Sequence, residues 1–185
     1  MSTVGAPQVG AREPGWFSEA WQGGHLPVVA IVATNWHRRI TDGLVAGAQK
    51  ALRHAGVSSW RTVRVPGAFE LPLGVQGVLG RGESDAVAGE SDAVAGETVD
   101  AAVALGVVIR GGTPHFDYVC RGATDGLTRV GLDAGKPVGF GVLTCDTEEE
   151  ALDRAGLPGS SSDKGAEAAE AVLDMLLVLW GTGVS

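Results

Sequence analysis

Hydrophobic and polar positions along this chain change period repeatedly, and the changes predict strands and helices in alternation. Stretches of strand length, mostly apolar or alternating, are typical of strands in a buried sheet. Between them, apolar residues recur three and four positions apart, as in a helix that buries one side. The expected strands are 27–33, 60–65, 101–109 and 137–143, and the expected helices are 38–54, 68–79, 116–132, 148–155 and 164–180.

The order of these elements, strand then helix four times with one further helix, predicts an α/β fold. We expect a three-layer, flavodoxin-like domain over residues 27–185, in which a parallel four-stranded sheet carries helices on both faces. The carboxyl ends of all four strands would then meet at one edge of the sheet, where open α/β sheets bind ligands.

Two segments fall outside this pattern. Residues 1–26 are rich in Gly and Pro and predict a flexible N-terminal tail, yet they contain Trp16 and Trp21. Two tryptophans suggest docking, with a neighbouring subunit as one possible surface, while a free arm remains the alternative.

The heptad at 84–90 is repeated without change at 91–97, which predicts an exposed, mobile loop insertion at about 82–99.

Composition narrows the class of protein. The hydrophobic content of 44% predicts a folded core, and a net charge of −8 without a Lys/Arg cluster argues against nucleic-acid and membrane-surface partners. No apolar run approaches the length of a membrane span, and the N-terminus does not resemble a signal peptide. Two cysteines, Cys120 and Cys145, fit a reducing compartment, so we expect a cytoplasmic protein. The four scattered histidines have no metal-ligand spacing, so we expect no metal.

The richest candidate chemistry follows the strand at 101–109. Arg110, Gly111 and Gly112 can turn the chain, and Thr113 is expected to cap a helix whose first position is Pro114. Such a turn presents free backbone N–H groups to an anion. His115 stands beside it, so the pattern predicts a site that holds a phosphate and moves protons, although an ordinary strand-to-helix turn has the same pattern.

Other candidate residues follow the remaining strands, at 35–37, 66–70 and 144–146. Because the predicted topology brings these segments to the same edge of the sheet, their convergence favours a genuine site.

Four motifs in this order resemble the lumazine synthase family: VPGAFELP at 65–72, LGVVIRGGTPHFDY at 105–118, FGVLT at 140–144, and DRAG at 153–156 with DKG at 163–165. The resemblance implies a condensation of 5-amino-6-(D-ribitylamino)uracil with 3,4-dihydroxy-2-butanone 4-phosphate. The products are 6,7-dimethyl-8-ribityllumazine, phosphate and water, in the penultimate step of riboflavin biosynthesis. It also implies that no cofactor takes part and that the chains associate in pentameric rings, some of which build shells of sixty subunits.

The resemblance also implies roles for residues that would bind the pyrimidine substrate. Trp36 matches an aromatic side chain that stacks on the ring, and Glu70 matches an acceptor for the ribityl hydroxyls. The adjoining contacts would come from the turn and from the strand end, the latter mainly through backbone atoms: Ala68, Phe69, Val107, Val108 and Ile109. A core tryptophan at 36 and a helix-dipole acid at 70 remain the alternatives.

The second substrate has its own implied residues. Gly112 and Thr113 match the phosphate cradle, and His115 matches the residue that transfers protons. Phe140, Arg154 and Lys164 match groups contributed by the adjacent subunit, the two cations reaching the phosphate. Core packing for Phe140 and solvated surface for the cations are the alternatives.

Two other functions share these motifs. A lumazine- or flavin-binding carrier would keep the pocket without the chemistry, and a shell protein would function through assembly itself. The presence of His115 and of both cations favours the enzyme. The loop at 157–163 is longer than we expect in shell-forming relatives, which favours a free pentamer or a pair of pentamers.

Overall fold

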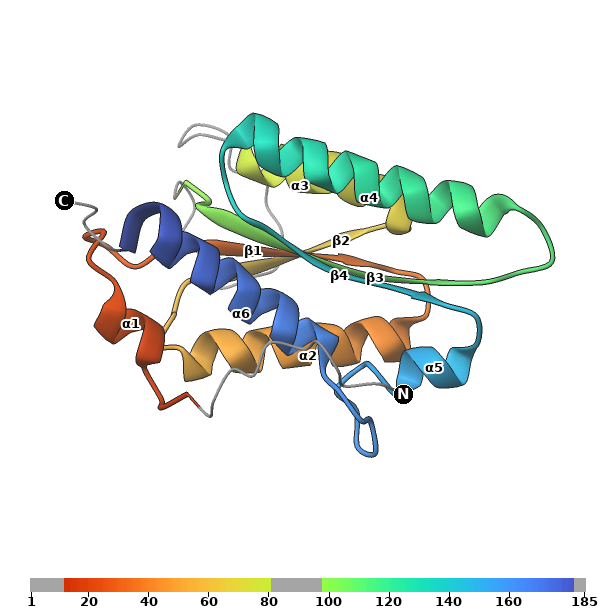
Figure 1. The fold of residues 1–185 in the computed structure, drawn as a ribbon, viewed down its shortest axis with the longest axis horizontal. Coiled ribbons are helices and arrows are strands. Elements are labelled where there is room, and N and C mark those ends of the chain that lie inside the picture. Colours follow the sequence, from red (N-terminus) through yellow and green to blue (C-terminus); the bar gives the residue numbers. More distant parts are fainter. Residues whose placement is uncertain (1–11, 81–97, 182–185) are drawn as a thin grey trace.

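The computed structural model describes residues 12–80 and 98–181 (Figure 1). It contains the predicted parallel sheet of four strands, in the order β2-β1-β3-β4. Both central strands are fully or largely buried, as their apolar sequences predict. The strands are β1 (Val29–Thr34), β2 (Trp60–Val65), β3 (Ala101–Ile109) and β4 (Val138–Cys145).

Helices cover both faces of the sheet, which confirms the three-layer α/β architecture (Figure 1). One face carries α2 (Arg38–His54) and α6 (Lys164–Leu176), with the short α1 (Trp16–Ala20) and α5 (Glu148–Leu152) beside them. The other face carries η1 (Ala68–Glu70), α3 (Leu71–Leu79) and α4 (His115–Ala134). All four strands end at the same edge of the sheet, from which α2, η1, α4 and α5 begin.

The segment before β1 packs on its own chain. Phe17 is fully buried, and its ring lies 5.8 Å from the ring of Trp16 and 5.3 Å from that of Trp21. Arg12 donates two hydrogen bonds, of 2.8 and 2.9 Å, to the carboxylate of Asp174 in α6. The expected flexible tail is therefore not found at residues 12–26, because aromatic burial and an ion pair fasten them to the domain.

Several boundaries differ from the sequence-based expectation, most of them by one or two residues, and three of these differences concern helix ends. The helix α4 begins at His115 with Pro114 as its N-cap, and Thr113 makes no capping bond. The helix α5 is opened as predicted by Thr147, whose hydroxyl accepts from the N–H of Glu150, but it ends at Leu152. The last helix, α6, ends at Leu176 and continues as a π-helical turn, η2 (Leu177–Gly181).

Two glycines allow α2 to contact the start of α6. A Cβ atom at Gly165 would overlap the carbonyl oxygen of Leu44, and one at Gly47 would overlap the carboxylate of Asp163. That carboxylate caps α6 by accepting from the N–H of Ala166 at 3.0 Å. The position of the first residue of α6, Lys164, is therefore set by close backbone contact with α2.

The repeated heptad lies outside the described residues. Both ends of the connection that contains it are held within the domain: Lys136 donates to the carbonyl oxygens of Leu79 and Val99, at 3.3 and 2.7 Å. Asp100 exchanges two hydrogen bonds of 2.9 Å with the backbone of Val28. No helix among the described residues is long and apolar enough to cross a membrane.

Candidate functional site

A cavity of about 520 Å³ opens at the carboxyl edge of the sheet. Its walls come from the β1–α2 turn, from η1 and the residue before it, from the end of β3 and from the first turns of α4. The lining residues are Trp36, His37, Gly67, Ala68, Phe69, Glu70, Val107, Val108, Ile109, His115, Tyr118 and Val119. Eight of the residues predicted from sequence therefore lie around one cavity.

Three aromatic side chains at this cavity are unusually exposed. Trp36, Phe69 and Tyr118 are 68%, 62% and 74% exposed, although rings of this size are normally largely buried. Trp36 is therefore not the core tryptophan of the alternative interpretation. Exposed flat rings around a cavity suit a planar ligand, since each aromatic stacking contact is worth about 0.5–1.5 kcal/mol beyond area burial.

Glu70 brings a carboxylate to the same wall as Trp36. A Cβ atom at Gly67 would lie 3.1 Å from Oε2 of Glu70 and 3.5 Å from Cδ1 of Trp36, so the glycine leaves room for both side chains. Glu70 makes no side-chain capping bond to α3. Its exposed carboxylate can therefore accept hydrogen bonds from hydroxyl groups in the cavity.

His37 lines the cavity with a strained backbone. It has φ 51° and ψ 54°, the only positive φ of a non-glycine residue in the described part of the chain. This left-handed conformation costs a residue such as histidine about 1–3 kcal/mol and is concentrated at functional sites. His37 belongs to the candidate segment 35–37, but no pattern in the sequence indicates its left-handed conformation.

The end of β3 forms one wall of the cavity. Val107 is buried, while Val108 and Ile109 are partly exposed to the cavity. The chain then passes through exposed Gly111, Gly112 and Thr113 to His115, the first residue of α4. Gly112 and Thr113 do not line the cavity, but they lie between Ile109 and His115, which do. The free N–H groups at the start of this 20-residue helix favour an anion there.

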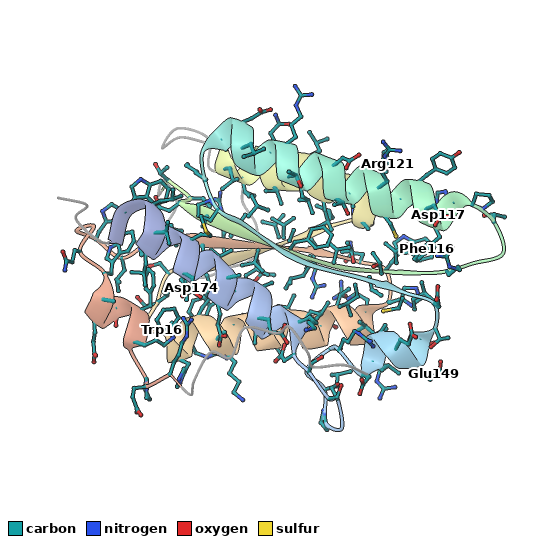
Figure 2. The ribbon with its side chains drawn as sticks, in the orientation of Figure 1. Trp16, Phe116, Asp117, Arg121, Glu149 and Asp174 are labelled. Atoms are coloured by element: carbon teal, nitrogen blue, oxygen red, sulfur yellow. The ribbon has the colours of Figure 1, made fainter. Side chains whose placement is uncertain are left out.

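Arg110 links this connection to two other elements. Its Nε donates to Asp146, after β4, at 2.7 Å, and its terminal nitrogen donates to Asp117, in α4, at 3.3 Å. Its guanidinium lies 4.0 Å from the ring centre of Phe116, which Figure 2 places with Asp117 at the start of α4. The hydrogen bond to Asp146 and the charge of Asp117 raise the pKa of Arg110, so the group stays cationic.

The remaining predicted residues do not line this cavity. Arg154 and Lys164 are brought together, because the N–H of Lys164 donates to the carbonyl oxygen of Arg154 at 3.0 Å. The guanidinium of Arg154 also donates to the carbonyl oxygen of Glu150 at 2.6 Å, and Lys164 pairs with Glu167 at 2.6 Å. Phe140 lies on the edge strand β4 and is 46% exposed, so it is not a core residue of the single chain.

The loop next to Arg154 is ordered by Asp153. Its carboxylate accepts from the N–H of Ser161 at 3.0 Å and from the hydroxyl of the same residue. These bonds stabilise the charged form and lower the pKa of Asp153. The backbone carbonyl of Asp153 also accepts from the N–H groups of Ser161 and Ser162. If α5 continued, this carbonyl would accept from an N–H of its own helix instead.

Of the other lining residues, His37 and Gly67 fall in the candidate segments 35–37 and 66–70, whereas Tyr118 and Val119 were not predicted. Tyr118 had a usable signal, because it stands three residues after His115 and therefore on the same side of α4. Within the described ranges, no three His, Cys, Asp or Glu side chains are placed to hold a metal ion.

Comparison with known proteins gives one consistent result. Residues 27–179 match the protein family described as 6,7-dimethyl-8-ribityllumazine synthase. The chain is 54% identical over 170 residues to the 6,7-dimethyl-8-ribityllumazine synthase of Leifsonia xyli subsp. xyli, covering 92% of this chain and 96% of that protein. It is 50% identical over 173 residues to the protein of that name from Streptomyces coelicolor, covering 94% and 91%. With the protein of that name from a Nocardioides species it shares 57% identity over 145 residues, 78% of this chain and 80% of the relative.

Proposed function

The chain belongs to the 6,7-dimethyl-8-ribityllumazine synthase family, and from this premise we propose which of its residues carry the reaction. The enzyme, a transferase of riboflavin biosynthesis, condenses 5-amino-6-(D-ribitylamino)uracil with 3,4-dihydroxy-2-butanone 4-phosphate. It releases 6,7-dimethyl-8-ribityllumazine, phosphate and water. The observation that carries the assignment of residues is the convergence of eight predicted residues on one cavity.

The pyrimidine substrate occupies the wall formed by the β1–α2 turn and η1. Trp36 stacks on its ring, since the exposed indole offers a flat face to the cavity. Glu70 accepts from the ribityl hydroxyls, and Ala68 and Phe69 bound the same wall. The backbone of Val107, Val108 and Ile109 meets the polar edge of the ring.

The phosphate of the second substrate binds at the start of α4. Gly112 and Thr113 precede the helix, so their N–H groups point toward an anion that the helix dipole attracts. The condensation moves several protons, because each amine nitrogen that bonds to carbon must give up a proton and water and phosphate must leave. His115, at the boundary between the two halves of the cavity, takes and returns these protons, which an imidazole can do near neutral pH.

Each complete site also draws on a second copy of the chain. Arg154 and Lys164 form one basic pair away from the cavity of their own chain, and Phe140 is exposed on the sheet edge. In a closed ring of identical subunits, these groups would reach the phosphate in the neighbouring cavity. The ring is a pentamer by resemblance to the family. We also propose a cytoplasmic location, which the two unpaired cysteines support.

Turnover and subunit exchange test the assignment together. Purified enzyme is assayed for lumazine formation, which a carrier or a purely structural shell protein would not show. The variants His115→Ala and Arg154→Ala are then dissociated, mixed and reassembled, with subunit exchange verified by mass. In a random ring, about a quarter of the sites would pair an intact His115 with an intact Arg154 of the neighbour, so activity should return.

The matched control is a mixture of His115→Ala with Glu70→Gln. Both changes lie in the part of the site that one chain supplies, so every site keeps one defect and activity should stay low. If activity fails to return in the first mixture after verified exchange, the shared site is wrong.

A further inference from the structure

We propose that Arg110 is a positioning residue of this reaction: it holds the first turn of α4, and with it His115 and the phosphate cradle, against the end of β3. The proposal rests on the proposed function, because it concerns the placement of the residues assigned to proton transfer and phosphate binding. Arg110 does not line the cavity.

The connection between β3 and α4 contains little that could fix its own geometry. Gly111, Gly112, Thr113 and Pro114 are all exposed. A Cβ atom at either glycine would have nothing within 4 Å, and Thr113 makes no capping bond. The body of α4 is held by its packing on η1, α3 and the sheet, so its first turn depends on that packing and on contacts that cross the connection.

Arg110 makes such contacts on both sides. Its backbone N–H donates to the carbonyl oxygen of Cys145 at 2.9 Å, which extends the pairing of β3 with β4 and fixes Arg110 to the sheet. Its side chain reaches over the connection to Phe116, at 4.0 Å, and to Asp117, at 3.3 Å. These are the two residues that follow His115 in the first turn of α4, so holding them also holds the backbone from which the imidazole extends.

A third contact orients the guanidinium itself. Asp146 accepts from Nε at 2.7 Å, and its own backbone N–H is held by the carboxylate of Glu150 at 3.0 Å. One planar group thus bridges two carboxylates on different elements while its face covers a phenyl ring. A lysine ammonium can pair with one of these carboxylates but cannot supply the planar fork.

The charges around Arg110 distinguish positioning from phosphate binding. Its cation lies between two carboxylates, so the group of three carries a net negative charge. Such a group attracts no anion, and the cations assigned to the phosphate remain Arg154 and Lys164 of the neighbour. Removal of Arg110 would change the geometry at the start of α4 and also leave both carboxylates unneutralised, and Arg110→Lys separates the two effects because it keeps the charge and loses the planar fork.

Arg110→Ala and Arg110→Lys are compared with Arg129→Ala. Arg129 lies in α4, about 21 Å along the helix axis from His115, and forms an exposed ion pair with Asp133 at 3.2 Å. Its removal therefore controls for the loss of a surface arginine. For each protein we would measure kcat, KM for both substrates, the Kd of the pyrimidine alone, the thermal midpoint and the mass of the assembly. Lumazine formation by the unmodified enzyme is measured first, because its absence would overturn the proposed function without testing Arg110.

We expect Arg110→Ala to lower kcat at least tenfold and to raise KM for the butanone phosphate. The pyrimidine Kd should stay within twofold, since Trp36 and Glu70 stand on other elements, and the midpoint and mass should match those of Arg129→Ala. Arg110→Lys should restore only part of kcat. Kinetic constants equal to those of Arg129→Ala would overturn the proposal, and so would an equal loss of pyrimidine binding, which would indicate a general structural defect.

If Arg110→Ala does not fold, Asp146→Asn makes the same comparison, because it keeps the shape of the side chain and removes the charge that orients Nε. A reduced kcat with unchanged pyrimidine Kd would support the positioning role. Unmodified kinetics in Asp146→Asn would overturn it.

Discussion

Deletion of one copy of the repeated heptad, residues 84–90, should leave kcat unchanged and raise the thermal midpoint slightly. The heptad lies in the connection from the end of α3 to the start of β3. That connection leaves the sheet at the edge opposite the cavity, because α3 begins at the carboxyl edge and runs back along the sheet (Figure 1). A change of length there should not reach the site.

The expected size of the effect follows from chain entropy. The connection has 19 residues between Leu79 and Val99, and 12 would remain. If the connection is a loop, closing the shorter one costs about 0.4 kcal/mol less. For a domain of this size, 0.4 kcal/mol corresponds to a rise in the midpoint of about 1–2 °C.

The hydrogen bonds that hold the two ends of this connection should matter more to stability than its length. Lys136 bonds to the carbonyl oxygens of both flanking residues, and hydrogen bonds from a charged donor are worth about 1.5–3 kcal/mol. Lys136→Met should therefore lower the midpoint by roughly 3–12 °C, while the heptad deletion does not. Differential scanning calorimetry on both variants, with steady-state kinetics, makes the comparison. A midpoint that falls by more than a few degrees on deletion would show that the heptad packs against the domain, and the loop interpretation would be wrong.

Three further predictions concern the site and its supports. His115→Ala should lower kcat by about 10²–10⁴-fold with the pyrimidine Kd nearly unchanged; near-normal kcat would contradict its role in proton transfer. Phe17→Ala should cost at most about 3–5 kcal/mol in unfolding free energy, and less if the segment 12–26 detaches alone, which proteolysis would reveal as early cleavage there; an unchanged midpoint and cleavage rate would refute the docking argument. Asp153→Asn should lower the midpoint at pH 7, and because the folded-state pKa is depressed, the deficit should shrink as pH falls below about 4 through that pKa; a deficit independent of pH would exclude the charge of Asp153 as its cause.

The sheet and its main helices were predictable because burial leaves a periodic trace in the sequence. The strands at Trp60–Val65 and Ala101–Ile109 and the helix at Arg38–His54 lie at the predicted residues. The start of α4 was not predictable, since Thr113 is a residue type that often caps helices but makes no capping bond here. Whether a hydroxyl reaches the N–H two or three residues ahead depends on the backbone of the glycines before it, which composition leaves open.

The site was predictable where topology alone brings residues together. Trp36, Glu70 and His115 follow successive strands, so a parallel sheet places them at one edge. Docking of the segment before β1 was one of two alternatives that Trp16 and Trp21 left open, and Phe17 was not selected because a five-residue helix is too short to show a period. The conformation of His37 was missed for another reason: a left-handed residue is held by tertiary context, and nothing in its neighbours' identities requires it.

The contact between α2 and α6 has a consequence for which substitutions the enzyme tolerates. Neither Gly47 nor Gly165 lines the cavity. Yet one added methyl group at Gly165 would push the first turn of α6 away from Leu44. That displacement would carry Lys164 with it, and through the backbone bond also Arg154. In a saturation library selected for activity, these two positions should therefore accept no larger residue, while exposed charged positions on α4 such as Arg129 vary widely.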